Sequence, residues 1–181
     1  MVIRFEKIVE IPYFPPRFVK HNVGQNYLDR RLRFWLEEKK DGGGTMTHKW
    51  IKALEATQTA LLATCENLEP RLRPMTLICK GGKLYFATGA TDTKSTQIAA
   101  NPNAEFCLLY RQGKYSGYLR GRGILRQVEE VARKKEIADF ATFIYDYWKE
   151  ASDPAYRLFE LELRQLRYLK PGDMYEEVAD L

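Results

Sequence analysis

The sequence contains few of the residues on which most catalytic and metal sites depend. In 181 residues it has two histidines, His21 and His48, and three cysteines, Cys65, Cys79 and Cys107. The cysteines are odd in number and widely spaced, so they fit neither a zinc-site spacing nor a disulfide framework. A nucleophile–histidine–acid set, a cluster of metal ligands and a glycine fingerprint for a nucleotide are all missing. We therefore expect reduced core cysteines in a cytoplasmic protein, and the sequence identifies no catalytic acid or base.

Long hydrophobic runs are absent as well. No apolar stretch approaches the roughly 20 residues that a membrane-spanning helix requires. The N-terminus, MVIRFEKIVEIPYF, carries charges inside its apolar stretch and lacks a small-residue cleavage site, so we expect no signal peptide. The net charge is only +5, and residues 1–45 hold nine Lys and Arg against six Asp and Glu. So small an excess argues against nucleic acid as a partner.

The sequence does contain many short strand patterns. Turns separate them, and 45% of the residues are hydrophobic, which is enough for one domain with a real core. The patterns predict strands over Thr57–Cys65, Arg71–Cys79, Lys83–Thr88, Ala104–Arg111, Lys114–Gln127 and Tyr156–Leu169, and helices over Thr47–Ala56, Lys94–Ala100 and Glu129–Tyr147. Most connections are too short for the crossovers of a parallel sheet. We therefore expect a mainly β fold, an antiparallel barrel with flanking helices.

Three of these strands carry further detail. Pro74 lacks an N–H, so its strand should be unpaired there or lie at an edge. The strand Ala104–Arg111 is too apolar on both faces to lie at an edge. The strand Lys114–Gln127 has glycines at 117, 121 and 123, which favour the bends and bulges that close a barrel. In the helix that follows, the residues that we expect to be buried are Val131, Ile137, Phe140 and Ile144.

A polar turn precedes the helix Lys94–Ala100. Within eight residues it offers three hydroxyls and an ammonium group, from Thr88, Thr93, Lys94 and Ser95. Free N–H groups at a helix N-terminus and a nearby ammonium group together suit a phosphate. The alternative is ordinary helix capping, with Thr91 or Asp92 as the N-cap and a solvated lysine. The residues alone leave both interpretations open.

The ordered series of motifs resembles one protein family. RxRPM in one strand, LYFATG in the next, TDTKS at the helix start and Asn101-Pro102 at its end follow one another as in the FMN-binding split-barrel family. The best-known members of that family are the pyridoxamine 5′-phosphate oxidases. The resemblance covers about Lys49–Gly172. It implies a six-stranded antiparallel split barrel, in agreement with the strand pattern, and a homodimer with FMN pockets between its subunits.

The resemblance also implies which residues bind FMN. Arg73, Pro74, Met75 and Thr76 would run along the isoalloxazine ring, and Thr88, Thr93, Lys94 and Ser95 would hold the phosphate. Thr93 stands where the oxidases often carry an arginine, which would remove one charge-assisted contact. For Arg73, a surface charge on an edge strand is the competing interpretation.

Other family features are weaker or missing. Arg120 and Arg122 match positions near the partner subunit's flavin, with a solvated barrel face as the alternative. Tyr147 and Trp148 could cover that flavin, with burial in the core as the alternative. True pyridoxamine 5′-phosphate oxidases carry a C-terminal Arg-x-His pair, whereas residues 164–168 read RQLRY here. Vitamin B6 oxidation is therefore not expected.

Residues 1–45 differ in character from the rest. They contain a proline-rich break at Ile11–Pro16 and an amphipathic helix pattern over Tyr27–Lys40, and they end in a glycine-rich joint. Met46 follows at once, so we expect a self-contained split-barrel domain over 46–181. Three interpretations of the first segment stay open: an arm that packs on the domain or a partner subunit, an extension absent from the shortest family members, or a stretch added in cloning.

Together these features predict an FMN-dependent oxidoreductase. It would transfer electrons or hydride to or from a small molecule, with NAD(P)H as one candidate donor, because the flavin itself carries the redox chemistry. Two alternatives remain. One is a protein that binds flavin or haem without turnover. The other is a deazaflavin-dependent reductase on the same fold, whose longer phosphate tail would use Arg71, Arg111 and Arg120.

Overall fold

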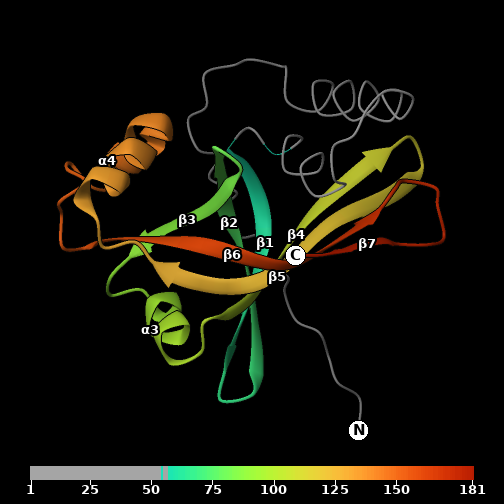
Figure 1. Cartoon of the computed structure of the whole chain (residues 1–181), viewed down its shortest axis with the longest axis horizontal. Helices are drawn as coiled ribbons and strands as arrows, with labels where there is room; N and C mark the ends of the chain where they lie inside the picture. The colour runs from blue at the N-terminus through green and yellow to red at the C-terminus, as the bar shows by residue number, and fades with distance from the viewer. Residues whose placement is uncertain (1–53, 55–56) are drawn as a thin grey trace, which may run out of the picture.

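The structure, a computed structural model, describes Leu54 and residues 57–181 (Figure 1). Its elements in chain order are β1 (Gln58–Glu66), β2 (Glu69–Lys80), β3 (Lys83–Gly89), α3 (Thr93–Ala100), β4 (Asn103–Gln112), β5 (Tyr115–Gln127), α4 (Val131–Phe140), the 3-10 helix η2 (Thr142–Asp146), β6 (Tyr156–Leu169) and β7 (Glu177–Asp180). In this part of the chain, no helix is long and apolar enough to cross a membrane. The predictions for residues 1–45 and, Leu54 apart, for the helix Thr47–Ala56 lie outside the described residues.

All the strands belong to one antiparallel sheet that curls into a ring. The strand order is β3-β2-β1-β4-β5-β6-β7, and β3 pairs in addition with β6, from Leu84↔Leu161 to Gly89↔Tyr156. That pairing closes six strands into a barrel, with β3 and β6 side by side in Figure 1. The predicted mainly β antiparallel split barrel is confirmed. The sequence pattern missed β7, a seventh strand that pairs with β6 and has too few residues to give a periodicity signal.

The positions of β4 and β2 in the sheet agree with their sequences. β4 lies between β1 and β5, as its two apolar faces predicted. β2 pairs with β1 from Glu69 to Leu77, but with β3 only from Ile78 to Lys80. Among the described residues, β2 is therefore unpaired on one side at Pro74, which is the arrangement that a strand proline requires.

The ladder between β5 and β6 contains a bulge. Arg122 pairs with Gln165, whereas the next residue, Gly123, pairs with Leu163, so β6 carries one extra residue. A Cβ atom at Gly123 would lie 2.0 Å from the carbonyl oxygen of Glu162. Only glycine therefore allows this close approach of the two backbones, as the interior glycines of the sequence predicted.

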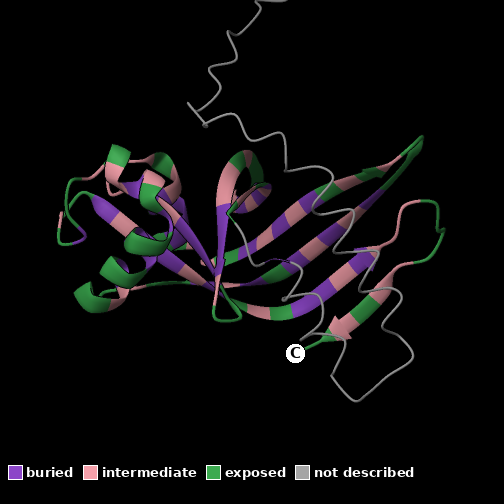
Figure 2. Ribbon diagram, turned by 90° about the horizontal axis from the view of Figure 1, so that it is seen from above, coloured by how far each residue is buried: buried purple, intermediate pink, exposed green. Residues whose placement is uncertain are grey.

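Two apolar clusters lie on opposite faces of the sheet, because alternate residues of the same strands contribute to each. The larger cluster fills the barrel and includes Leu62, Leu77, Phe86, Phe106, Leu119, Leu161 and Leu166. The second packs α4 and η2 against β3 and β6, and it includes Tyr85, Ile137, Ala141, Ile144, Tyr156 and Leu158. Figure 2 shows the resulting alternation of buried and partly exposed residues along the strands. Both faces of β3 and β6 are therefore covered.

The predicted helix Glu129–Tyr147 is divided into α4 and η2. The backbone leaves the helical region at Ala141, with φ −108° and ψ 71°. Two of the four predicted core residues of this segment are buried, but Val131 and Phe140 are 52% and 43% exposed. The prediction was wrong for these two. Val131 starts α4 at the surface, and the break at Ala141 ends the single helical periodicity on which the prediction depended.

Candidate functional site

The turn between β3 and α3 forms a compact start for the helix. β3 ends at Gly89, and Asp92 begins α3 as its N-cap residue, with φ −67° and ψ 139°. The Ala90 N–H donates to the Ala155 carbonyl over 2.7 Å, which fixes the turn to the segment before β6. The Asp92 side chain makes no capping hydrogen bond to the helix. Its carboxylate is directed to other partners.

Three donors converge on one oxygen of Asp92. The Thr88 hydroxyl donates to Oδ2 over 2.7 Å, the Gly89 N–H over 3.0 Å and the Lys94 ammonium group over 2.5 Å. Lys94 above all, then Thr88 and Gly89, lower the pKa of Asp92 from 3.8 to about 2. The Asp92 carboxylate thus occupies three donors of a kind that a phosphate or another carboxylate also accepts from. The donors Thr88, Gly89 and Lys94 are called the anion cradle below.

The other two predicted phosphate ligands have different environments. The hydroxyl of Ser95 is buried and donates to the Gly89 carbonyl over 2.7 Å, so it supports the turn rather than the cradle. Thr93 is exposed at the first position of α3. Sequence reasoning treated Asp92 only as a cap and missed it as the partner of Thr88 and Lys94. The available signal was a negative charge two residues before the lysine.

Arg73 lies in a hydrogen-bonded cluster rather than on an open surface. Its guanidinium group donates to Thr64 Oγ1 and to Gln97 Oε1, each over 2.6 Å, and Thr64 also donates to Gln97 over 2.9 Å. Thr64 and Gln97 are each 4% exposed. Burial, and next the charge of Arg71, lower the pKa of Arg73. Arg73 therefore joins β2 to β1 and to α3, a role that neither sequence interpretation foresaw.

The residues after Arg73 follow the open edge of β2. Pro74 is exposed, Met75 packs against the barrel cluster, and Thr76 is partly buried. The backbone groups on this side meet no strand among the described residues until Ile78 pairs with β3. Such an edge can present its backbone groups to a planar ligand.

Tyr147 and Trp148, the two aromatic residues that could cover a flavin, lie in different environments. The ring of Trp148 stacks on that of Tyr156, with 5.1 Å between centroids and an interplanar angle of 28°. It packs against the second apolar cluster, whereas Tyr147 is 73% exposed. The core interpretation therefore holds for Trp148 but not for its neighbour.

Two arginines of the deazaflavin alternative already have acidic partners. Arg71 pairs with Glu66 at 3.2 Å and with Glu69 at 2.8 Å. Arg120 pairs with Glu105 at 2.5 Å. Their charges are balanced locally, which leaves little positive potential for a long phosphate tail.

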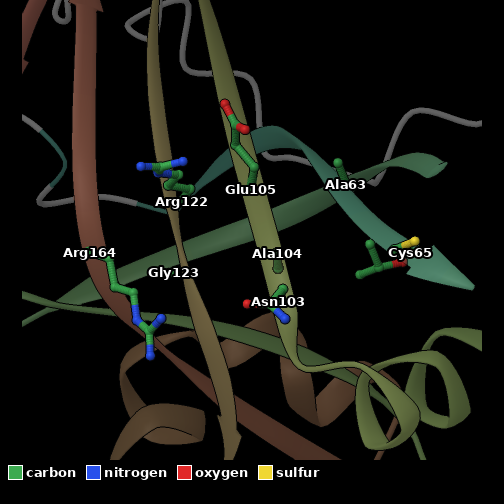
Figure 3. A pocket seen from close by; sticks show the side chains of 9 residues that line it. Ala63, Cys65, Asn103, Ala104, Glu105, Arg122, Gly123 and Arg164 are labelled. Carbon is green, nitrogen blue, oxygen red and sulfur yellow. The ribbon is translucent and has the colours of Figure 1, made fainter. Parts of the chain in front are cut away.

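A pocket of about 510 Å³ crosses β1, β4, β5 and β6 (Figure 3). Its walls include Thr64, Glu105, Arg122 and Arg164. A smaller pocket of about 150 Å³ adjoins it and shares Glu105 and Arg122. Thr64 also bonds to Arg73, but on the barrel face of β1, which carries Leu62, so the Arg73 cluster and the pocket lie on opposite faces of the sheet. The sequence singled out Arg122 but gave no sign that Arg164 lies across the same pocket.

Comparisons with known proteins agree on the fold. Residues 46–170 match the family described as pyridoxamine 5′-phosphate oxidase. General stress protein 26 from Bacillus anthracis is similar in structure, with a TM-score of 0.61 and 22% identity over 76% of this chain and 100% of that one. For a putative pyridoxamine 5′-phosphate oxidase from Listeria innocua, the TM-score is 0.57 and the identity 22%, over 68% of this chain and 98% of that one. For a haem-binding protein from Mycobacterium smegmatis, the TM-score is 0.62 and the identity 13%, over 77% of this chain and 60% of that one. No curated protein matches the chain.

Proposed function

Because the chain belongs to the pyridoxamine 5′-phosphate oxidase family, we propose that it is an FMN-dependent oxidoreductase acting on a small molecule. The lack of the Arg-x-His pair in residues 164–168 argues against vitamin B6 as that molecule. The observation that carries the proposal is the convergence of Thr88, Gly89 and Lys94 on a single anionic oxygen.

The donors of the anion cradle fit the phosphate of FMN. A hydroxyl, a backbone N–H and an ammonium group are the donors that phosphate sites at helix N-termini commonly combine. The Asp92 carboxylate now accepts from all of them, and a phosphate would have to displace it. The Asp92 side chain is 44% exposed, so it has solvent into which it can rotate.

The chain's own residues would bind and orient the cofactor. Lys94 and Thr88 hold the phosphate, and the open edge of β2 from Arg73 to Thr76 lies along the ring. The bonds from Arg73 to Thr64 and Gln97 keep that edge at a fixed distance from α3. FMN, when bound, supplies electron or hydride transfer, and the protein supplies position and electrostatics.

A homodimer with the cofactor between its subunits completes this proposal. The open edge of β2 and the 65% exposed side chain of Leu72 beside it provide a surface for the second subunit. NAD(P)H is the proposed electron donor. A cytoplasmic location fits the absence of disulfides among Cys65, Cys79 and Cys107.

An absorption spectrum tests the cofactor directly. The protein is scanned as purified, then again after addition of FMN and desalting, and NAD(P)H is added last. We expect retained flavin absorbance that NAD(P)H bleaches. Lys94→Ala should weaken FMN binding by about tenfold or more, because a charge-assisted contact is worth roughly 1.5–3 kcal/mol. Lys83→Ala is the matched control, since Lys83 is exposed on β3 and pairs with Glu160.

A protein that takes up no flavin would contradict the proposal, and equal retention by Lys94→Ala and Lys83→Ala would contradict the role of Lys94. The same scan tests the second candidate, haem binding, which the similarity to the Mycobacterium smegmatis protein raises. The two histidines of the chain lie outside the described residues, and FMN is the better supported cofactor because the donors of the anion cradle suit a phosphate.

A further inference from the structure

The β6 bulge changes the direction of one arginine. In the β5–β6 ladder Arg164 has no partner, because Arg122 pairs with Gln165 and Gly123 with Leu163. Leu166 belongs to the barrel cluster and Leu163 packs against it. The two residues between them, Arg164 and Gln165, therefore lie together on the opposite face of β6, where regular alternation would place only one.

Arg164 and Arg122 border the same pocket. The cavity of about 510 Å³ lies on the face of the sheet that carries Glu105, and Figure 3 shows the two arginines on the neighbouring strands β6 and β5. Asn103 from β4 also lines the pocket, and in Figure 3 β5 runs between it and Arg164. The volume is in the usual range of pockets for small molecules, about 300–1,000 Å³.

Among the described residues, the neighbouring arginines form ion pairs and these two form none, although Glu105 lies opposite Arg122 in the β4–β5 ladder. On β5, Arg120 pairs with Glu105 at 2.5 Å and Arg126 with Glu162 at 2.7 Å, and on β6, Arg167 pairs with Glu176 at 3.0 Å. Arg122 and Arg164 make no ion pair and no side-chain hydrogen bond within the described part of the chain. Glu105, the one carboxylate among the lining residues, is already bonded to Arg120.

We propose that this pocket binds a small organic anion, whose carboxylate or phosphate group is held by Arg122 and Arg164. A guanidinium group offers a planar fork of donors that matches either oxyanion, and two such groups without an ion pair among the described residues favour a negatively charged ligand in the pocket. The Asn103 amide donates one N–H to Asn101 over 2.8 Å and has a second N–H that can orient the ligand.

The anion site depends only on Arg122, Arg164 and the bulge, not on FMN. Thr64 lines the pocket from β1, but its hydroxyl accepts from Arg73 on the barrel face of that strand, which also carries Leu62. The pocket and the Arg73 cluster therefore lie on opposite faces of the sheet.

The test is a titration with succinate, a dicarboxylate that carries no phosphate, in about 0.1 M salt to screen weak surface attraction. Binding is followed by NMR of the backbone amides and of the arginine Nε–Hε groups. We expect saturable shifts at Arg122 and Arg164. Arg122→Gln and Arg164→Gln should each weaken binding by roughly tenfold or more, because each removes charge-assisted contacts. Arg126→Gln, on the same strand and face, and Lys94→Ala should bind succinate as the unaltered protein does.

Absence of saturable shifts at the two arginines would overturn the proposal, and so would an equal loss of binding in Arg126→Gln. Loss of succinate binding in Lys94→Ala alone would also overturn the proposal, because succinate would then bind at the anion cradle and not in the pocket. An unchanged amide spectrum establishes that each variant is folded. A protein that binds succinate but takes up no FMN would support the anion pocket and refute the proposed function. A protein that retains FMN but does not bind succinate would refute the anion pocket and leave the proposed function standing.

Discussion

Lys94 and Asp92 form an ion pair of 2.5 Å at the start of α3, and the same carboxylate oxygen accepts from Thr88 and the Gly89 N–H. An anion from the chain itself therefore occupies the position that the donors would offer to a phosphate. The consequence is a competition between Asp92 and any external phosphate for the same three donors.

Asp92→Asn should tighten FMN binding by severalfold, since the neutral amide competes less strongly for Lys94 than the carboxylate does. A fluorescence titration of FMN measures the change. Asp139→Asn is the matched control, because Asp139 forms a similar exposed pair with Lys135 at 2.7 Å, on α4. Weaker FMN binding in Asp92→Asn would mean that Asp92 holds the cradle in shape rather than competing for it.

The same ion pair predicts how stability depends on pH. The folded-state pKa of Asp92 is about 2, below its ordinary value of 3.8. A depressed pKa contributes stability that is complete above the unfolded-state pKa and is lost as the pH falls through the folded-state value. Unaltered protein should therefore melt at a higher temperature than Asp92→Asn at pH 6, and the difference should shrink between about pH 4 and pH 2. A difference independent of pH would contradict the role of the charge.

Arg73→Ala should lower the free energy of unfolding by about 1–3 kcal/mol, because it leaves the buried Thr64 and Gln97 with fewer partners. Urea denaturation measures the loss. Arg71→Ala is the control on the same strand: the Arg71 side chain is 46% exposed in its ion pairs, so its removal should cost at most about 1 kcal/mol. Equal costs for the two variants would show that the Arg73 cluster adds nothing.

Gly123→Ala should destabilise the protein by about 1–3 kcal/mol, since the added methyl group meets the Glu162 carbonyl and must push β5 and β6 apart. Thermal melting detects this, with the exposed Ser116→Ala on the same strand as control. The displaced bulge should also move Arg164 and weaken succinate binding. A stable Gly123→Ala protein with unchanged succinate affinity would contradict the importance of the bulge for the pocket.

Much of the fold could be predicted because its signals are local. The aromatic and apolar residues of β3, the turn residues after β2 and the apolar character of β4 each act within a few residues, and short connections exclude a parallel sheet. Val131 and Phe140 were misplaced because one periodicity was extended across the break at Ala141, which local sequence does not mark. β7 was missed because four residues paired with β6 leave no pattern of their own.

The sequence by itself determined that Thr88, Asp92 and Lys94 lie close together. They are at most six residues apart, and the turn between a strand and a helix keeps such residues near one another. The sequence could not determine that the Asp92 carboxylate turns toward Lys94 rather than capping α3, since both orientations suit the same backbone. Only the tertiary structure decided the contacts of Arg73 with Thr64 and Gln97, which join residues 9 and 24 positions apart. It also decided that Arg122 and Arg164 share a pocket, because a one-residue shift in strand register exchanges the faces of a sheet, and no local pattern fixes that shift.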